Sequence, residues 1–141
     1  MSRNVDLELL LTLARNAQTH AYAPYSGFRV GAAVVSESGP VHVGCNVENA
    51  AYPATTCAEA SAIASMIVAG GTRIAAIMIV GDGVKLVTPC GNCRQIIREF
   101  ANADTTIHIA GPQGVRASFT LEDLLPESFG PENVATSKHG G

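Results

Sequence analysis

The stretch "TTCAEASAIASMIVAGGTRIAAIMIVG", residues 55–81, decides the fold, because a helical pattern stands directly before a strand pattern. Residues 57–69 are rich in alanine, which has the highest helix propensity, and glycines 70 and 71 give the signal that commonly ends a helix. Residues 73–81 are short, apolar and partly β-branched, which is typical of a buried strand. A helix followed at once by a buried strand favours an α/β protein.

Outside this stretch the alternation continues, and the spacing of the apolar residues predicts two more helices and four more strands. The helices are expected at residues 5–20 and 91–101, and the strands at 28–35, 40–48, 105–111 and 114–120, followed by a short helical turn within 121–132. This order favours a three-layer α/β/α sandwich around a mixed five-stranded sheet. We expect residues 1–132 to form a single domain and residues 133–141 to be a mobile tail.

Composition and charge exclude several classes of function. The 141 residues include 9 Lys+Arg and 12 Asp+Glu without a basic run, so the chain lacks the electrostatic footprint of a nucleic-acid-binding protein. The N-terminal region intersperses acidic and polar residues among its apolar ones, which fits neither a signal peptide nor a membrane span. We therefore expect a cytoplasmic protein that binds no membrane.

The chain contains four cysteines, Cys45, Cys57, Cys90 and Cys93. In an intracellular domain such thiols more often bind metal or take part in catalysis than form disulfides. A catalytic zinc site uses three protein ligands and leaves one position open. Cys57, Cys90 and Cys93 can supply these ligands, whereas Cys45, on an alternating apolar strand, is expected to be a small core residue.

The three candidate ligands stand at the beginnings of two expected helices. Cys57 opens one helix, after two threonines either of which can cap it, and Cys90 and Cys93 lie three residues apart at the start of the other. A shared metal requires the two helix N-termini to converge. Three thiolates on Zn²⁺ leave a charge of about −1, and each helix N-terminus contributes roughly +0.5, so convergence compensates the charge and should stabilise the thiolates.

Glu59 follows Cys57 by two residues and is better placed beside a water on the metal than as a ligand. A carboxylate in that position can take a proton from the water and return it elsewhere, which is general acid/base chemistry. The sequence therefore predicts one zinc ion per subunit, with Glu59 as the catalytic residue.

The pattern C-x-E followed by P-C-x-x-C is the three-cysteine form of the motif of zinc nucleobase deaminases. On this motif the chain resembles the small, homotetrameric, zinc-dependent cytidine deaminases of pyrimidine salvage. The resemblance extends in order through "AYAPYSGFRVGAAV", "NVENAAYPATTCAEA", "TPCGNCRQ" and "LLPESFGPE". It implies a cytidine deaminase-like sandwich and the hydrolysis of cytidine and deoxycytidine to uridine and deoxyuridine with release of ammonia.

The resemblance also implies substrate-binding residues. Phe28 would pack on the pyrimidine, Asn46 and Glu48 would hydrogen-bond the ribose hydroxyls, and Ala58 would offer backbone groups to the base edge. A strand through Asn46 and Glu48 agrees, because alternate residues of a strand point to the same face. Phe129 would reach into a neighbouring subunit's site, so the implied homotetramer shares its active sites between subunits.

Two departures from the family pattern concern the metal site and the base pocket. Three-cysteine members usually carry an arginine directly after the catalytic glutamate, whereas this chain has Ala60. Arg94 stands at a matching position and is expected to supply part of the missing positive charge. Pro53, in "AAYPATT", can reshape the base pocket.

Other functions are compatible with parts of the pattern. The same chemistry serves relatives that act on a different aminopyrimidine nucleoside of the blasticidin kind, although "NVENAAYP" keeps both the Asn and the Glu for ribose. A noncatalytic zinc-binding module would hold the metal without releasing ammonia. A thiol redox protein would form a reversible disulfide between Cys90 and Cys93 and hold no stoichiometric metal.

Overall fold

The computed structural model describes residues 5–134. Its strands form a five-stranded sheet in the order β2-β1-β3-β4-β5, in which β3 and β4 are parallel and the other neighbours are antiparallel. The elements in chain order are α1 (Leu7–Gln18), β1 (Val30–Ser36), β2 (Val41–Cys45), the 3-10 turn η1 (Tyr52–Ala54), α2 (Ala58–Val68), β3 (Ile74–Gly81), α3 (Gly91–Phe100), β4 (Thr106–Gly111), β5 (Gly114–Thr120) and α4 (Leu121–Leu124).

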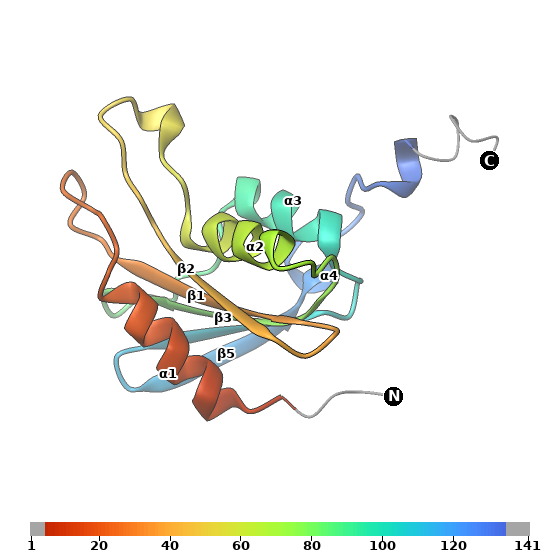
Figure 1. Cartoon of the computed structure of the whole chain (residues 1–141), viewed down its shortest axis with the longest axis horizontal. Coiled ribbons are helices and arrows are strands. Elements are labelled where there is room, and N and C mark those ends of the chain that lie inside the picture. Colours follow the sequence, from red (N-terminus) through yellow and green to blue (C-terminus); the bar gives the residue numbers. More distant parts are fainter. Residues whose placement is uncertain (1–4, 135–141) are drawn as a thin grey trace.

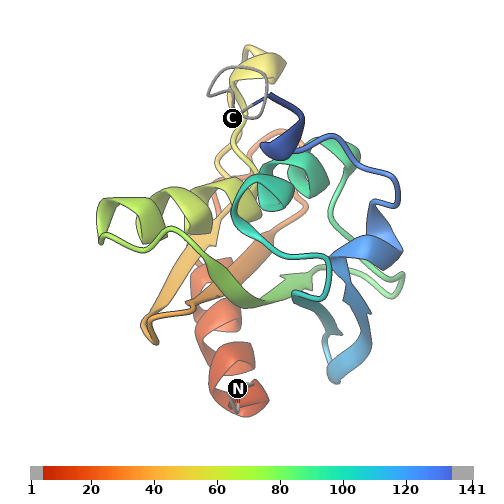
Figure 2. The ribbon, with the colours of Figure 1, turned by 90° about the vertical axis from the view of Figure 1, so that its right-hand side faces the viewer.

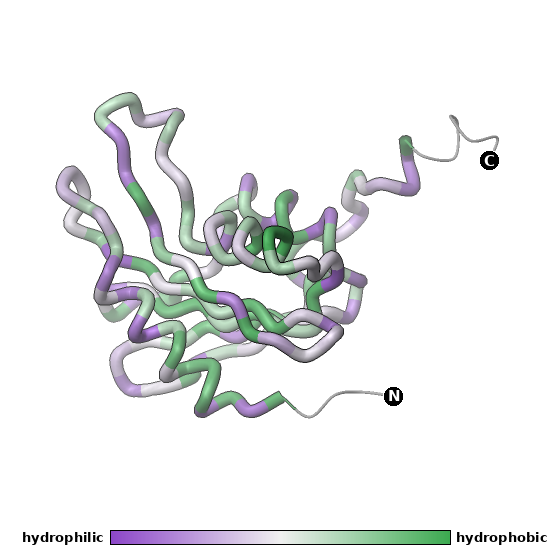
Figure 3. The backbone as a smooth tube through the Cα atoms, in the orientation of Figure 1, coloured by the Kyte–Doolittle hydropathy of each residue, from purple (hydrophilic) through white to green (hydrophobic). Residues whose placement is uncertain are grey.

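Helices cover both faces of the sheet (Figure 1, Figure 2). Alternate residues of a strand point to opposite faces, so Val34 and Ile77 belong to the core beneath α2 and α3, whereas Ala33 and Met78 pack with α1. Hydrophobic residues run along the central strands, and hydrophobic and hydrophilic residues alternate along α1 (Figure 3). The predicted three-layer sandwich around a mixed five-stranded sheet is confirmed.

The second strand is shorter than expected. β2 ends at Cys45 rather than at residue 48, because the chain beyond it leaves the sheet and Val47 forms isolated bridges with Tyr22 and Thr56 instead. Asn46 and Glu48 therefore lie in a loop that follows the strand.

The start of α2 also differs from the prediction. Cys57 is the N-cap residue, and no side chain caps the helix, so the expectation that Thr55 or Thr56 caps it is wrong. The hydroxyl oxygen of Thr55 instead accepts a hydrogen bond from the amide of Asn49 at 3.1 Å. Thr55 thus fixes the loop before the helix, and the helix end remains open toward the cysteines.

Helix α2 crosses β2 at very short range over Gly44. A Cβ atom at this position would lie 2.7 Å from both the carbonyl oxygen of Ala58 and the hydroxyl oxygen of Ser61, well inside van der Waals contact. Only glycine permits this approach, which seats the first turn of α2 directly on the sheet.

The C-terminal residues continue past α4 along α3. Asn133 and Val134, at the start of the expected tail, donate backbone hydrogen bonds to Gly130 and Pro131, and residues 135–141 of that tail lie outside the described residues. Among the helices of residues 5–134, none is both long and apolar enough to cross a membrane.

Candidate metal and catalytic site

The side chains of Cys57, Cys90 and Cys93 meet where α2 and α3 begin. Cys57 is the N-cap of α2, Cys90 is the N-cap of α3, and Cys93 lies in the first turn of α3. Their three sulfur atoms all lie within 4.8 Å of one another. The two helix N-termini therefore converge on one point, as predicted.

The donor set fits zinc. Tetrahedral Zn²⁺ with Zn–S bonds of about 2.3 Å holds its sulfurs roughly 3.8 Å apart, so a cluster within 4.8 Å accepts the ion after small side-chain adjustments. Cys93 is buried, Cys57 is half-buried and Cys90 is exposed, so one side of the cluster is open to solvent. Three ligands with an open side are typical of a catalytic rather than a structural zinc site.

Burial opposes ionisation of these thiols. It raises the pKa of Cys57, and burial together with the carboxylate of Glu59 raises the pKa of Cys93. Desolvation of the charged form is the largest cause of both rises, and it acts on the thiols in the absence of a metal. A divalent cation reverses this balance, since coordination deprotonates a thiol directly.

Glu59 lies in the first turn of α2, next to the cysteine cluster. Its side chain is 5 % exposed, and burial raises the pKa of its carboxyl, opposed by hydrogen bonds with its own backbone and with Cys93. A buried carboxyl with a raised pKa takes up and returns protons closer to neutral pH than an exposed one. The position thus suits general acid/base chemistry at the open side of the sulfurs.

Arg94 holds the segment that directly precedes Cys90. Its guanidinium donates to the carbonyl oxygens of Pro89 and Leu124, each at 2.7 Å, and to the hydroxyl of Thr88 at 3.3 Å. It therefore anchors the residues that directly precede Cys90 and ties them to α4.

Asn46 is held against the segment that carries Phe28. Its side-chain amide donates to the carbonyl oxygen of Phe28 and accepts from the amide of Val30, each at 2.9 Å. An Asn amide has two N–H donors, so one donor of Asn46 is left over for a ligand. The side chain of Phe28 is 38 % exposed.

Glu48 is bonded to the loop before Phe28. One carboxylate oxygen accepts from the amides of Tyr25 at 3.0 Å and Ser26 at 3.1 Å, and the other accepts from the Ser26 hydroxyl. These bonds lower the pKa of Glu48, the Ser26 hydroxyl most of all. A carboxylate has about four acceptor positions, so about one is left for a ligand.

Ser26 is a residue that the sequence reasoning missed. Its hydroxyl donates to Glu48 and accepts from the amide of Phe28 at 2.9 Å, and so it connects two of the predicted substrate-binding residues. The sequence offered a signal only for a turn, because Glu48 is 22 residues away along the chain.

The remaining predicted residues lie around the ends of the same helices. Ala58 is buried as the first residue of α2, where backbone N–H groups have no partner within the helix. The side chain of Phe129 is 62 % exposed, beyond α4. Cys45 lies outside the sulfur cluster and is only half-buried, so its expected place in the core is wrong.

A hollow of about 390 Å³ adjoins Glu48. It is lined by Tyr25, Ser26, Glu48, Asn49, Tyr52 and Thr55. Tyr25 and Tyr52 pack edge to face with ring centres 6.4 Å apart and remain more than half exposed. Two larger hollows, of about 630 and 650 Å³, adjoin the C-terminal segment and the start of α1, and the cysteines line neither.

Comparison with known families and proteins agrees with this geometry. The model of a family described as the cytidine and deoxycytidylate deaminase zinc-binding region matches residues 4–109. The chain is 38% identical over 131 residues to a cytidine deaminase of Sporosarcina psychrophila, covering 93% of this chain and 96% of that protein. It is 39% identical over 130 residues to a cytidine deaminase of Halalkalibacterium halodurans, covering 92% and 98%.

Solved structures of cytidine deaminases also superimpose on this chain. The crystal structure of cytidine deaminase from Burkholderia pseudomallei superimposes with a TM-score of 0.83 at 41% identity, covering 89% of this chain and all of the other. Cytidine deaminase from Mycobacterium tuberculosis superimposes with a TM-score of 0.78 at 39% identity, covering 90% and 99%.

Proposed function

This chain belongs to the family of cytidine and deoxycytidylate deaminases, and from that membership we infer that it is a zinc-dependent cytidine deaminase. It hydrolyses cytidine and deoxycytidine to uridine and deoxyuridine and releases ammonia. One observation carries the inference from the site itself: a buried glutamate beside three convergent cysteine sulfurs.

Cys57, Cys90 and Cys93 would hold one zinc ion in each subunit, and their close approach supports this ligand set. When bound, zinc supplies a Lewis acid that makes water a nucleophile near neutral pH. The two helix N-termini contribute roughly +0.5 charge each, which offsets the excess charge of three thiolates. Arg94 adds positive charge and holds the chain before Cys90 in place.

Glu59 moves the protons. It takes one from the attacking water and delivers it to N3 of the pyrimidine as the water oxygen adds to C4. It then takes the proton of the hydroxyl group now on C4 and delivers it to the amino group, which leaves as ammonia when the C4–N bond breaks and the C4 carbonyl forms. Its burial supports this role, because a raised pKa lets one carboxyl act first as base and then as acid.

Asn46 would bind a ribose hydroxyl through the N–H donor that its protein contacts leave free, and Glu48 would bind one through its remaining acceptor position. Phe28 would pack on the base, and its partial exposure supports such contact. The first N–H of α2, at Ala58, would bind the base edge.

We further propose a homotetramer in which Phe129 of one subunit contacts a neighbour's nucleoside. The high exposure of Phe129 in the single chain supports this placement, because a large aromatic side chain gains from burial. A free nucleoside as substrate fits a cytoplasmic enzyme of pyrimidine salvage.

Ammonia release from cytidine and deoxycytidine, with zinc content measured on the same sample, tests the function. We expect Glu59→Gln to retain zinc and fold, because the change keeps shape and removes one charge, and to lose turnover by roughly a hundredfold or more. Turnover near that of the unmutated protein would refute the role of Glu59. Bound zinc without ammonia from either nucleoside would redirect the search to other aminopyrimidines.

A further inference from the structure

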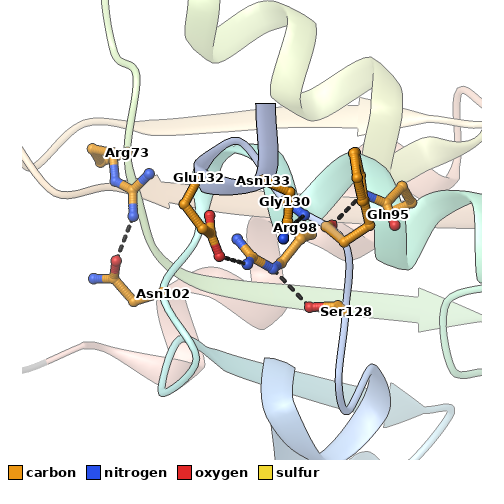
Figure 4. Close-up of polar contacts among 9 residues, drawn as sticks. Arg73, Gln95, Arg98, Asn102, Ser128, Gly130, Glu132 and Asn133 are labelled. Carbon is orange, nitrogen blue, oxygen red and sulfur yellow. Dashed lines mark hydrogen bonds and ion pairs between the residues drawn. The ribbon is translucent and has the colours of Figure 1, made fainter. Parts of the chain in front are cut away.

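The C-terminal residues 128–132 are held against one side of α3 by hydrogen bonds and an ion pair (Figure 4). Gln95 donates its side-chain amide to the carbonyl oxygen of Phe129 at 2.9 Å. One turn further along, Arg98 donates to the hydroxyl of Ser128 at 2.7 Å and forms an ion pair with Glu132. Side chains three residues apart on a helix share a face, so Gln95 and Arg98 act on the same segment.

Arg98 also packs on the backbone of this segment. A Cβ atom at Gly130 would overlap the guanidinium group, which shows that the planar head lies directly on the glycine. The Arg98 side chain is only 17 % exposed, although Glu132 is 61 % exposed. The guanidinium is therefore partly desolvated and bonded on two sides, unlike a free surface arginine.

The segment needs such contacts. Glu127, just before it, has a φ of 52°, an unfavourable backbone conformation for a residue with a side chain. Phe129 has little packing of its own in the chain, since 62 % of its surface is exposed. Contacts with α3 offset this strain and fix where the Phe129 backbone stands.

We propose that Arg98 is a positioning residue that sets Phe129 for its contact with the neighbouring subunit's nucleoside. The proposal rests on the proposed function, and it adds the residue that controls this contact. Helix α3 follows its N-cap residue Cys90 and holds Cys93 in its first turn. The same helix carries Gln95 and Arg98 further along. Helix α3 therefore positions two of the three proposed metal ligands of its own site and also the aromatic side chain that would enter the neighbouring subunit's site.

The test compares steady-state kinetics of Arg98→Gln with those of the unmutated zinc enzyme. We expect KM for cytidine to rise roughly three- to tenfold with kcat within about twofold, because a weakened hydrogen-bonded ion pair loosens substrate contact and leaves the reacting groups in place. Arg98→Lys should recover part of the loss, since lysine keeps the charge without the planar fork.

Arg73→Gln is the matched control. Arg73 lines the same hollow between α3 and the C-terminal segment, but its guanidinium donates to the side chain of Asn102. We expect its KM to match that of the unmutated enzyme. In a Phe129→Ala background, Arg98→Gln should raise KM little further, because both substitutions remove the same contact between Phe129 and the nucleoside.

Hydrogen exchange of the amides of Ser128, Phe129, Gly130 and Glu132 gives a readout independent of activity, and these amides should exchange faster in Arg98→Gln. An unchanged KM in Arg98→Gln, or full additivity with Phe129→Ala, would overturn the proposal. An unmutated enzyme that releases no ammonia from cytidine would instead overturn the proposed function, and the positioning role with it.

Discussion

Replacing Gly44 by alanine should disable the site without replacing any of its proposed ligands, catalytic or substrate-binding residues. The added methyl group would lie 2.7 Å from the carbonyl oxygen of Ala58 and from the hydroxyl of Ser61, and closer still to the amide of Ala62. Two of these three atoms belong to the backbone of α2, so a rotamer change cannot relieve the clash. The helix has to move away from the sheet.

The required movement follows from these separations. Ordinary contact between heavy atoms begins near 3.4 Å, so α2 has to shift by about 1 Å. Overpacking of this kind costs roughly 1–3 kcal/mol of stability. The same shift displaces Cys57 and Glu59 from Cys90 and Cys93, which α3 carries. A misplacement of about 1 Å in a reacting group can cost a hundredfold in rate, and we expect a loss of that order in kcat.

Gly31→Ala is the matched control, on the neighbouring strand and the opposite face. Its methyl group would lie 2.1 Å from the carbonyl oxygen of Ala14 and 2.7 Å from the amide nitrogen of Gln18, both in the backbone of α1. The steric overlap is at least as severe as at Gly44, but α1 carries none of the proposed metal ligands. We expect at least as large a loss in urea stability, with full zinc content and a kcat within about threefold of the unmutated enzyme.

The assay measures zinc per chain, kcat at saturating cytidine and the urea midpoint for both variants. We expect Gly44→Ala to lose zinc affinity and kcat, and Gly31→Ala to lose stability alone. If Gly44→Ala kept full zinc and a normal kcat, the close crossing of α2 over β2 would not position the site. If both variants lost kcat equally, general destabilisation would explain the effect.

Three smaller predictions concern single side chains of the site. Ala60→Arg should move the acidic limb of the pH profile of kcat/KM to lower pH, because a guanidinium beside Glu59 and the thiolates favours their ionised forms; an unmoved limb contradicts this account. Ser26→Ala should raise KM for cytidine roughly three- to tenfold with little change in kcat, because it frees Glu48 and the Phe28 amide; steady-state kinetics decide it. Cys45→Ser should leave zinc content unchanged by metal analysis, because Cys45 lies outside the sulfur cluster.

The parts of the site that could be predicted are those with local signals. The spacing of Cys90 and Cys93 at a helix start and of Cys57 and Glu59 at another is read directly from the chain, and the structure keeps both arrangements. The layer order followed from the alternation of helices and strands. The two spacings depend on neighbours within one helical turn, and the layer order depends only on the sequence of helices and strands along the chain.

The parts that could not be predicted depend on distant partners. The bond between Ser26 and Glu48 joins residues 22 apart, and the ion pair of Arg98 and Glu132 joins residues 34 apart. The early end of β2 has the same origin, since Val47 leaves the sheet to pair with Tyr22 and Thr56. Propensity and periodicity carry no information about such pairings, which tertiary packing decides.

The convergence of the cysteines follows from the chain order around β3. Helix α2 turns through residues 70–73 into β3, so it runs antiparallel to that strand and begins beside the strand's carboxyl end. Helix α3 follows β3 in a crossover to the parallel strand β4, so it also runs back from that end. Both helices pack on the same face, in one core with Ile77 and Ile79. Two helices that flank one strand in this order and pack on the same face have their N-termini together at the strand's carboxyl end. The N-cap cysteines of α2 and α3 meet there, so residues far apart in sequence can hold one metal.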